Sequence, residues 1–301
     1  MPSVVVDDIF KAYANVEAVS GVSFKIEEGE VFGLLGPNGA GKSTIIRLIL
    51  DFIEPDKGKI EVLGGKFSEK TKEQVGYLPE ERGLYEDITV MDNLLYLAGL
   101  KGMNAFGARK KAIALLERVG LKEKAKEKVN ALSKGMRQLA QICATLIHEP
   151  ALLIFDEPFS GLDPNNRELV KQIIKQEKKA GRTIILSTHM MNEAEEICDR
   201  VLMINNGRRV LYGDVENVKN SYASHSIFVE FEGSFPQLSG VEKADVRNNS
   251  AELSLRIDTD PQGILRQLVD SGVIVRKFDV KELSLNQIFI RVVEAEKWIK
   301  Q

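Results

Sequence analysis

The sequence is poor in cysteine and histidine. Only two cysteines, Cys143 and Cys198, occur among its 301 residues. Two cysteines cannot form a disulfide framework, and no spacing of cysteine and histidine suggests a zinc site. We therefore expect both thiols to be buried as small apolar side chains in a reducing compartment. Of the three histidines, His148 and His225 have no partner that the sequence identifies.

Long apolar runs are also missing. The longest stretches without a charged side chain, Val31–Gly41 and Gln138–His148, have eleven residues each. A bilayer span needs about 18 or more apolar residues, so none is expected. The first ten residues carry acids where a signal peptide carries bases, which predicts a cytosolic protein. The formal charge of -3, from 41 basic and 44 acidic residues, argues against binding nucleic acid by bulk electrostatics.

What the sequence does contain is an ordinary globular composition, with 44% apolar and 28% charged residues. Its length allows about two domains. Up to about residue 215, apolar strands alternate with amphipathic helices, which predicts a mostly parallel sheet with helices on its faces. The predicted strands are Ser3–Val6, Val22–Ile26, Val31–Leu35, Lys59–Leu63, Ala151–Phe155, Thr183–Ser187 and a hairpin of Val201–Ile204 with Arg209–Tyr212. The predicted helices are Lys42–Phe52, Glu168–Lys179 and Asn192–Asp199.

Between Thr89 and His148 the apolar spacing is helical throughout. We expect a helical subdomain over about residues 85–150. The mixed-sign run Lys122–Lys128 within it is most simply a solvated helix face.

The pattern changes near residue 220, where we place a domain boundary. Beyond it, Ile227–Phe231, Glu252–Ile257 and Ile274–Val280 are predicted strands, and Pro261–Asp270 and Leu285–Trp298 are predicted helices. The expected organisation is an α/β domain over residues 1–220 and a small α+β domain over residues 221–301. The second domain contains no catalytic constellation, so a stabilising or dimerising role is the simplest one.

A glycine-rich segment joins the strand Val31–Leu35 to the following helix. It reads Gly36-Pro37-Asn38-Gly39-Ala40-Gly41-Lys42-Ser43 and fits G-x-x-x-x-G-K-[ST] in the context that this motif requires. Backbone N–H groups and a helix N-terminus can surround phosphate oxygens there. Lys42 is expected to neutralise the β and γ phosphates, and the Ser43 hydroxyl to ligate Mg²⁺. The alternative is a chance glycine turn.

Two adjacent carboxylates end the apolar strand Leu152–Asp156. Asp156 is placed to reach the Mg²⁺ shell, and Glu157 to polarise an attacking water as general base. Two acids after a strand are more often an ordinary polar exit, but the upstream phosphate loop favours the catalytic interpretation.

Further segments follow in a characteristic order. Leu132–Gln138 precedes a helix that Ser133 could simply cap, yet the segment resembles the signature loop of ATP-binding cassette (ABC) ATPases. Tyr77–Glu80 resembles the Q-loop of that family, Ser160–Asp163 the D-loop and Ser187–His189 the switch-histidine segment. Tyr13 stands where the adenine-stacking aromatic is expected. The chain is thus similar to an ABC nucleotide-binding domain over roughly residues 1–215.

This resemblance implies a P-loop NTPase (RecA-like) core with a β-subdomain and a helical subdomain, binding ATP with Mg²⁺. It implies catalytic roles for Glu157, His189 and Lys42, and metal ligation by Ser43, Asp156 and Glu80. The nucleotide-binding residues that it implies are Tyr13, Gly36, Pro37, Asn38, Gly39, Ala40, Gly41, Lys42, Ser43, Thr44, Ser133, Gly135 and Asp163. Two copies are expected to pack head to tail, so that Ser133 and Gly135 of one touch the γ-phosphate held by the other.

Three positions depart from the family pattern. Lys134 and Met136 replace a glycine and a glutamine of the usual signature loop, and Glu80 replaces the Q-loop glutamine. A carboxylate at position 80 could ligate Mg²⁺ more strongly than an amide, or repel the γ-phosphate when the metal is absent.

Three functional classes use such an ATPase. The sequence favours the energy subunit of a membrane exporter, lying on the cytoplasmic face of the membrane with a separate multi-span permease and a second copy or a homologous cassette. The strand and helix order of about residues 222–301 resembles the accessory domain of bacterial sodium and drug exporters, and Leu283–Phe289 matches the way those chains end. A translation factor would carry two cassettes, and a DNA-repair ATPase would carry long insertions; a regulatory nucleotide-binding module is the remaining alternative. The cargo stays open among sodium, drugs, lipids and peptides, and no nucleic-acid partner is expected.

Overall fold

The computed structural model describes residues 2–14, 16–81, 83–222, 226–256, 259–280 and 283–299. Backbone contacts divide the chain into two compact units, Met1–Val215 and Glu216–Gln301. His225 and Ile257, which figure in the expectations above, lie outside the described residues.

The first unit is built on a six-stranded sheet. Its strands, in the order β5-β6-β7-β3-β8-β9, are β5 (Val75–Leu78), β6 (Leu152–Asp156), β7 (Thr183–Thr188), β3 (Val31–Leu35), β8 (Arg200–Asn205) and β9 (Arg208–Asp214). Neighbours are parallel except for the β8–β9 hairpin. Every residue of β3, β6 and β7 is buried, as expected for apolar runs in a sheet covered on both faces. The predicted parallel sheet and closing hairpin are confirmed.

The strand order determines which loops can meet. Strand β7 lies between β6 and β3, and the three run parallel. Because the carboxyl ends of parallel strands lie at one edge of a sheet, the segments that follow β3, β6 and β7 come together there. These segments are the glycine-rich loop, the two carboxylates and the switch-histidine segment.

A second, antiparallel sheet has the order β2-β1-β4, formed by β1 (Pro2–Tyr13), β2 (Val16–Glu27) and β4 (Lys57–Val62). Strands β1 and β2 are longer than predicted. Register shifts, including one between Val6 and Ile9, carry β1 past the polar Asp7 and Asp8, and such bulges interrupt the alternation by which a strand is predicted. Residues of this sheet share one core with β3 and the helix α1 (Lys42–Ile49).

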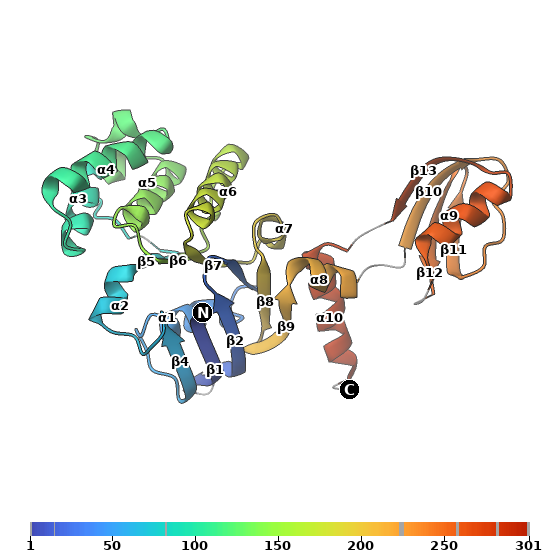
Figure 1. Cartoon of the computed structure of the whole chain (residues 1–301), viewed down its shortest axis with the longest axis horizontal. Coiled ribbons are helices and arrows are strands. Elements are labelled where there is room, and N and C mark those ends of the chain that lie inside the picture. Colours follow the sequence, from blue (N-terminus) through green and yellow to red (C-terminus); the bar gives the residue numbers. More distant parts are fainter. Residues whose placement is uncertain are drawn as a thin grey trace. The chain divides into compact units, whose positions relative to one another are not determined.

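Three helices, α3 (Val90–Leu100), α4 (Ala105–Arg118) and α5 (Lys134–Leu146), form the helical subdomain, which is the green group at the left of Figure 1. Each begins at a polar residue whose side chain accepts a backbone N–H in the first turn, namely Thr89, Asn104 and Ser133.

The helix predicted for Lys122–Lys128 is wrong. Only Lys122–Lys124 forms a single 3₁₀ turn, η1. The backbone N–H groups of Val90 and Met91 bond to the carbonyls of Glu127 and Ala125, at 3.0 and 2.9 Å. These long-range bonds hold the segment across the start of α3 in a non-helical path.

The other helices of this unit are α2 (Glu69–Gln74), α6 (Pro164–Lys179) and α7 (Met191–Glu195). Helix α6 starts before the predicted Glu168 because Asp163 caps it and Pro164 occupies its first turn. Helix α7 ends at Glu195, well before the predicted Asp199. Helix α2 and strand β5, six and four residues long, had no predicted counterpart.

The second unit contains an antiparallel sheet with the order β11-β12-β10-β13, formed by β10 (Ser226–Glu232), β11 (Val241–Arg247), β12 (Ser250–Leu255) and β13 (Ile274–Val280). Helix α9 (Pro261–Asp270) buries Ile264 and Leu268 in its core. Helices α8 (Val215–Ser221) and α10 (Leu285–Ile299) precede and follow the sheet in the chain. Strand β11 escaped prediction because most of its residues are exposed. No helix in the described part of the chain is long and apolar enough to cross a bilayer.

Candidate functional site

The glycine-rich loop lies between β3 and α1, with two glycines in positions that no other residue fits. Gly36 has φ 153° and Gly41 has φ 110°. A Cβ atom on Gly36 would lie 2.2 Å from the carbonyl oxygen of Ile204, and one on Gly41 would lie 2.4 Å from that of Ala18. Glycine at both positions therefore lets the loop pack against the carbonyl groups of β8 and β2 without a clash.

Lys42, the first residue of α1, is buried with its ammonium group turned back over the loop. Its Nζ donates hydrogen bonds to the carbonyl oxygens of Gly36 at 2.9 Å and Pro37 at 3.2 Å. The same Nζ lies 3.3 Å from Glu157 Oε1. One ammonium group thus joins the loop after β3 to the carboxylate after β6.

Glu157 is buried, with 4% of it exposed, and contacts three consecutive residues in addition to Lys42. Its backbone is left-handed, with φ 49°, and its N–H donates to the Ser187 carbonyl at 2.9 Å. Its Oε2 accepts from Thr188 Oγ1 at 3.3 Å and lies 2.9 Å from His189 Nδ1. The three predicted catalytic residues, Lys42, Glu157 and His189, therefore meet around one carboxylate.

Asp156 is a buried carboxylate whose Oδ1 accepts no hydrogen bond within the described residues. Burial raises its pKa above the ordinary value, and the charges of Glu80 and Glu157 raise it further, while the Ser187 and Ser43 hydroxyls lower it. Burial and the two neighbouring carboxylates both disfavour the negatively charged form of Asp156. A cation or a proton therefore stabilises the Asp156 carboxylate. Ser43 and Glu80 lie beside it and offer further oxygen ligands for a cation.

The described residues hold no group of three His, Cys, Asp or Glu side chains arranged to bind a metal ion by themselves. Ser43, Asp156 and Glu80 are a hydroxyl and two carboxylates, and oxygen ligands of this kind suit Mg²⁺. Such a partial set is what a metal shared with phosphate oxygens requires.

A cavity of about 500 Å³ opens over the glycine-rich loop. Its walls are Val16, Glu17, Ala18, Asn38, Gly39, Gly41, Lys42, Ser43, Thr44, Glu80, Glu157, Asn206 and Gly207. Tyr13, the expected adenine-stacking residue, is exposed and pairs in register with Val16, but it is not itself part of these walls.

The signature loop lies apart from this cavity. Ser133 caps α5, and its Oγ accepts from the Met136 N–H at 3.3 Å. Ser133 and Lys134 are exposed, and Gly135 is half-buried. The Lys134 side chain lies against Gly161, and Asp163 caps α6 by accepting from the Asn166 N–H at 3.0 Å. None of Ser133, Gly135 and Asp163 lines the cavity of its own chain.

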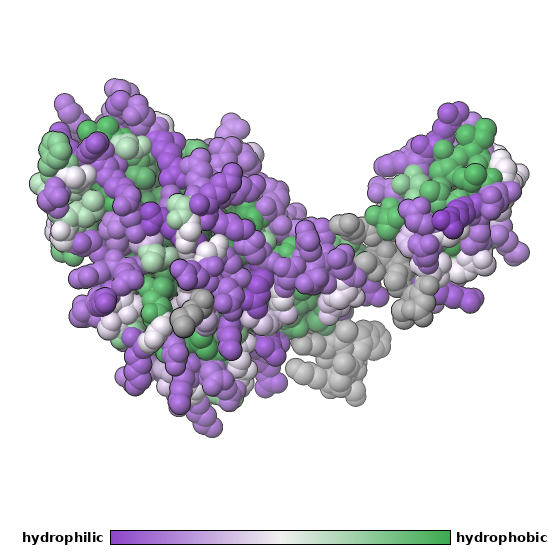
Figure 2. Space-filling view, in the orientation of Figure 1, coloured by the Kyte–Doolittle hydropathy of each residue, from purple (hydrophilic) through white to green (hydrophobic). Residues whose placement is uncertain are grey.

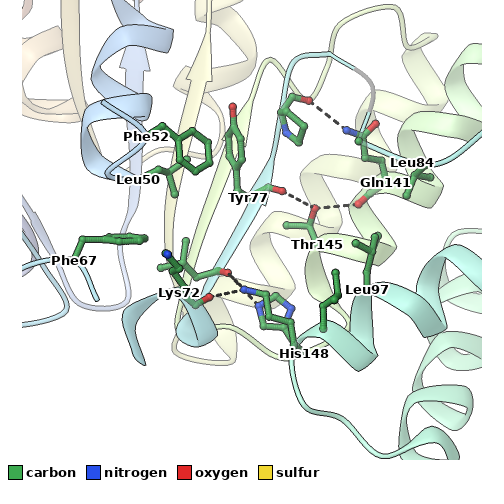
Figure 3. A pocket seen from close by; sticks show the side chains of 16 residues that line it. Leu50, Phe52, Phe67, Lys72, Tyr77, Leu84, Leu97, Gln141, Thr145 and His148 are labelled. Carbon is green, nitrogen blue, oxygen red and sulfur yellow. Dashed lines mark hydrogen bonds between the residues drawn. The ribbon is translucent and has the colours of Figure 1, made fainter. Parts of the chain in front are cut away.

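A second cavity, of about 430 Å³, lies between the helical subdomain and the sheet edge formed by β5 (Figure 3). Most of its lining is apolar, including Leu50, Phe52, Phe67, Leu84, Leu97 and Leu100. We call it the groove. The helical subdomain and the segment before it also carry exposed apolar side chains, and Figure 2 shows green over α3 and α4. These residues are Tyr85, Ile88, Tyr96, Leu100, Phe106 and Ile113.

Two residues of the groove carry interactions that the sequence did not reveal. His148 has a partner after all, since its Nε2 lies 3.1 Å from the Val75 carbonyl oxygen and must donate to it. Burial, together with the charge of Lys101, lowers the pKa of His148 to about 4. Gln141, which no motif singled out, is bonded to the Q-loop backbone. Both cysteines are buried as expected, and burial raises the pKa of Cys143 to about 12.

Comparison with known proteins agrees with this geometry. Residues 19–160 match the ABC transporter family and residues 213–293 match the C-terminal domain of DrrA1-3-like ATP-binding proteins. The chain is 37% identical, over 96% of its length and 98% of the relative, to "Uncharacterized ABC transporter ATP-binding protein YhaQ" of Bacillus subtilis. It is 35% identical to "Nod factor export ATP-binding protein I" of Rhizobium sp. (strain N33), over 95% of each chain.

It is also 42% identical to "Linearmycin resistance ATP-binding protein LnrL" of Bacillus subtilis, over 69% of this chain and 68% of that protein. Among solved structures, "Structure of ATP binding subunit of ABC transporter" superposes with a TM-score of 0.68 at 32% identity, over 73% of this chain and 92% of that one. The fold, the phosphate loop and these relatives lead to one conclusion. The chain belongs to the ABC transporter ATP-binding proteins, the ATP-hydrolysing subunits that work with membrane permeases.

Proposed function

We propose that the triphosphate of ATP lies along residues Gly36–Thr44, with Lys42 against the β and γ phosphates. The carrying observation is the convergence of Lys42, Glu157 and His189 within 3.3 Å contacts at the mouth of the phosphate loop. Lys42 is paired with Glu157 in this structure. Phosphate oxygens compete for the same ammonium group, and their binding frees Glu157 to orient a water for attack, with His189 holding the carboxylate.

A magnesium ion fits beside these phosphates. Asp156 has a raised pKa and a buried oxygen that accepts no hydrogen bond from the described residues, so a cation stabilises its charged form. Ser43 and Glu80 complete the protein's share of the ligands, and the ion supplies charge neutralisation when it is bound.

Replacing Glu80 by Gln tests this assignment. Removing one carboxylate should weaken metal binding, which electron paramagnetic resonance of Mn²⁺ measures with ADP present. The Mn²⁺ concentration for half-maximal binding should rise about three- to tenfold. Binding of ATP without metal should tighten, because repulsion between carboxylate and phosphate is lost. The control is Glu81→Gln, since Glu81 lines a neighbouring cavity and not the phosphate cavity. Equal metal affinities in Glu80→Gln and the unaltered chain would remove Glu80 from the ligand set.

The position of the signature loop supports head-to-tail pairing. Ser133 and Lys134 are exposed, and neither Ser133 nor Gly135 lines the phosphate cavity of its own chain. We propose that Ser133, Gly135 and Asp163 complete the site of a second copy or of a homologous cassette, which Lys134 approaches with an additional positive charge.

The membrane partner is proposed to dock at the groove. The groove is apolar, and one of its walls, the segment that includes Tyr77 and Pro79, continues directly into Glu80 in the phosphate cavity. An apolar segment of a permease seated there would contact both the helical subdomain and the edge of the six-stranded sheet. The names of relatives that export Nod factor or confer linearmycin resistance support an exporter on the cytoplasmic face of the membrane. In this proposal, residues 1–220 of the chain are the ATPase domain and residues 221–301 are an accessory domain.

Detergent co-purification tests this partner. The tagged chain, purified from solubilised membranes of its own host, should carry a multi-span membrane protein with it. Leu100→Asp, at an exposed residue of the groove, should reduce that recovery about tenfold by burying a charge in the interface. Phe106→Asp is the matched control, because Phe106 is 84% exposed but lies outside the groove. Recovery of ribosomes or DNA in place of a membrane protein would contradict the proposal.

A further inference from the structure

We propose that Gln141, Thr145 and His148 are positioning residues that fix the signature helix α5 to the backbone of the Q-loop, so that the two move as one body. This inference rests on the proposed role of the signature loop in completing a partner's site. We call these three residues the α5 ladder. They lie on one face of the helix and the segment that follows it, at spacings of four and three residues, and all three line the groove (Figure 3).

The α5 ladder bonds alternate carbonyl groups of one extended segment. His148 Nε2 lies 3.1 Å from the Val75 oxygen. Thr145 Oγ1 lies 3.4 Å from the Tyr77 oxygen and 3.0 Å from the Gln141 carbonyl oxygen, so its one proton is shared between these two acceptors. Gln141 Nε2 lies 3.5 Å from the Pro79 oxygen and 3.2 Å from the Glu81 oxygen. Dashed lines in Figure 3 mark the contacts with Val75, Tyr77 and Pro79.

The spacing of the two elements makes this register specific. Four residues of an α-helix rise about 6 Å, and two residues of a strand advance about 6.6 Å, so side chains one turn apart meet every second carbonyl. Sliding α5 along β5 by one residue would separate every donor from its acceptor. Apolar side chains could fill the same space, but they would not set this register.

Two of the four acceptors, Val75 and Tyr77, belong to an edge strand, and Pro79 and Glu81 follow it in the chain. Strand β5 ends the six-stranded sheet, so one row of its carbonyl groups has no neighbouring strand. Side chains of the helical subdomain bond this row instead, and Lys101, at the end of α3, adds donors to the carbonyls of Lys72 and Val75. His148 suits this role as a neutral donor because burial and neighbouring Lys101 lower its pKa.

The ladder links the two loops that recognise nucleotide. At one end Gln141 holds the carbonyls on both sides of Glu80. Gly83 lies so close to Gln141 that a Cβ there would be 2.8 Å from its Nε2. From Gln141, α5 extends back about two turns to its cap at Ser133, the residue proposed to touch a partner's phosphate. A shift of Glu80 toward a bound metal would therefore displace Ser133 with it, and a segment seated in the groove would press on the same side chains.

Spin-label distances test the ladder on the monomer. Cysteines placed at the exposed residues Phe106, in α4, and Lys175, in α6, report the position of the helical subdomain relative to the core. Cys143 and Cys198 are buried with raised thiol pKa values and resist labelling. We expect one narrow distance distribution. The double variant Gln141→Met/Thr145→Val, of similar volume but without the donors, should broaden that distribution about twofold. Thr145→Ser, which keeps the hydroxyl, should stay narrow.

Ile142→Val is the matched control, because it removes a buried methylene from α5 without touching the ladder. In a Glu157→Gln background the double variant should raise the ATP concentration for half-maximal dimer about tenfold, with Kd for ATP on the monomer unchanged. An unaltered distance distribution in Gln141→Met/Thr145→Val, or equal broadening in Ile142→Val, would overturn the ladder. Absence of dimer in Glu157→Gln alone would reject head-to-tail pairing, while the spin-label distances would still decide the ladder.

Discussion

Replacing Glu157 by Gln is expected to reduce phosphate release by a factor of about 10² to 10⁴, the range that a positioned general base contributes. An amide has nearly the same shape as the carboxylate, but it cannot accept the proton of the attacking water. Because the substitution removes the ion pair with Lys42 as well, ATP gains an unopposed ammonium group. The variant should therefore bind ATP at least as tightly as the unaltered chain and accumulate as an ATP-bound dimer.

Two measurements check this expectation. Phosphate release gives the turnover, and size-exclusion chromatography with Mg²⁺ and ATP gives the oligomeric state. The matched control is Glu177→Gln, a buried carboxylate paired with Arg118 and Arg182 at 2.7 Å, remote from the phosphate cavity. It should lose stability but keep its turnover at temperatures where it is folded. If the turnover of Glu157→Gln equals that of the unaltered chain, Glu157 is not the general base. Elution as monomer only would count against the head-to-tail dimer.

Local patterns predicted the segments that meet at the proposed phosphate site. The glycine-rich loop and the pair Asp156–Glu157 are each encoded by a strand and the few residues after it. A short segment is enough to specify such a turn, since the glycines permit backbone angles that other residues avoid. The parallel sheet was also predictable, because its buried strands are continuous apolar runs.

The contacts between those segments were not predictable in the same way. His189 meets Glu157 because β7 lies between β6 and β3, and no property of the residues near His189 states that order. The family resemblance implied a catalytic role for His189, but not its contact with Glu157. The failed helix at Lys122–Lys128 has the same origin, since backbone bonds to the start of α3 override a helical charge pattern.

The contacts of the α5 ladder were the hardest to predict from the sequence. Gln141 and Thr145 interrupt the apolar face of α5, and in sequence they look like polar positions on an amphipathic helix. Their contacts depend on β5 being an edge strand, and this four-residue element was too short to predict. A polar residue at an otherwise buried helical position, followed by another at i+4, is the signal that could have indicated an edge to be bonded.

Replacing Lys42 by Ala is expected to abolish ATP binding and hydrolysis together. The ammonium group is the one side-chain cation among the described residues that line the phosphate cavity, and it faces Glu157 at 3.3 Å. Without it, the carboxylates of Glu157, Asp156 and Glu80 repel the triphosphate with no opposing side-chain charge. We expect Kd for ATP, measured by isothermal titration calorimetry, to rise about 100-fold or more, which corresponds to a loss of about 3 kcal/mol.

Phosphate release by Lys42→Ala should fall to the level of the buffer. Lys175→Ala provides the control, since it removes a lysine from an exposed position on α6 and should leave both measurements unchanged. The outcome also separates binding from chemistry. Glu157→Gln should keep ATP and lose turnover, whereas Lys42→Ala should lose both, because in the proposed site the lysine contacts the phosphates in the ground state and the glutamate acts on the water. Unchanged phosphate release in Lys42→Ala would mean that the catalytic cavity lies elsewhere in the chain.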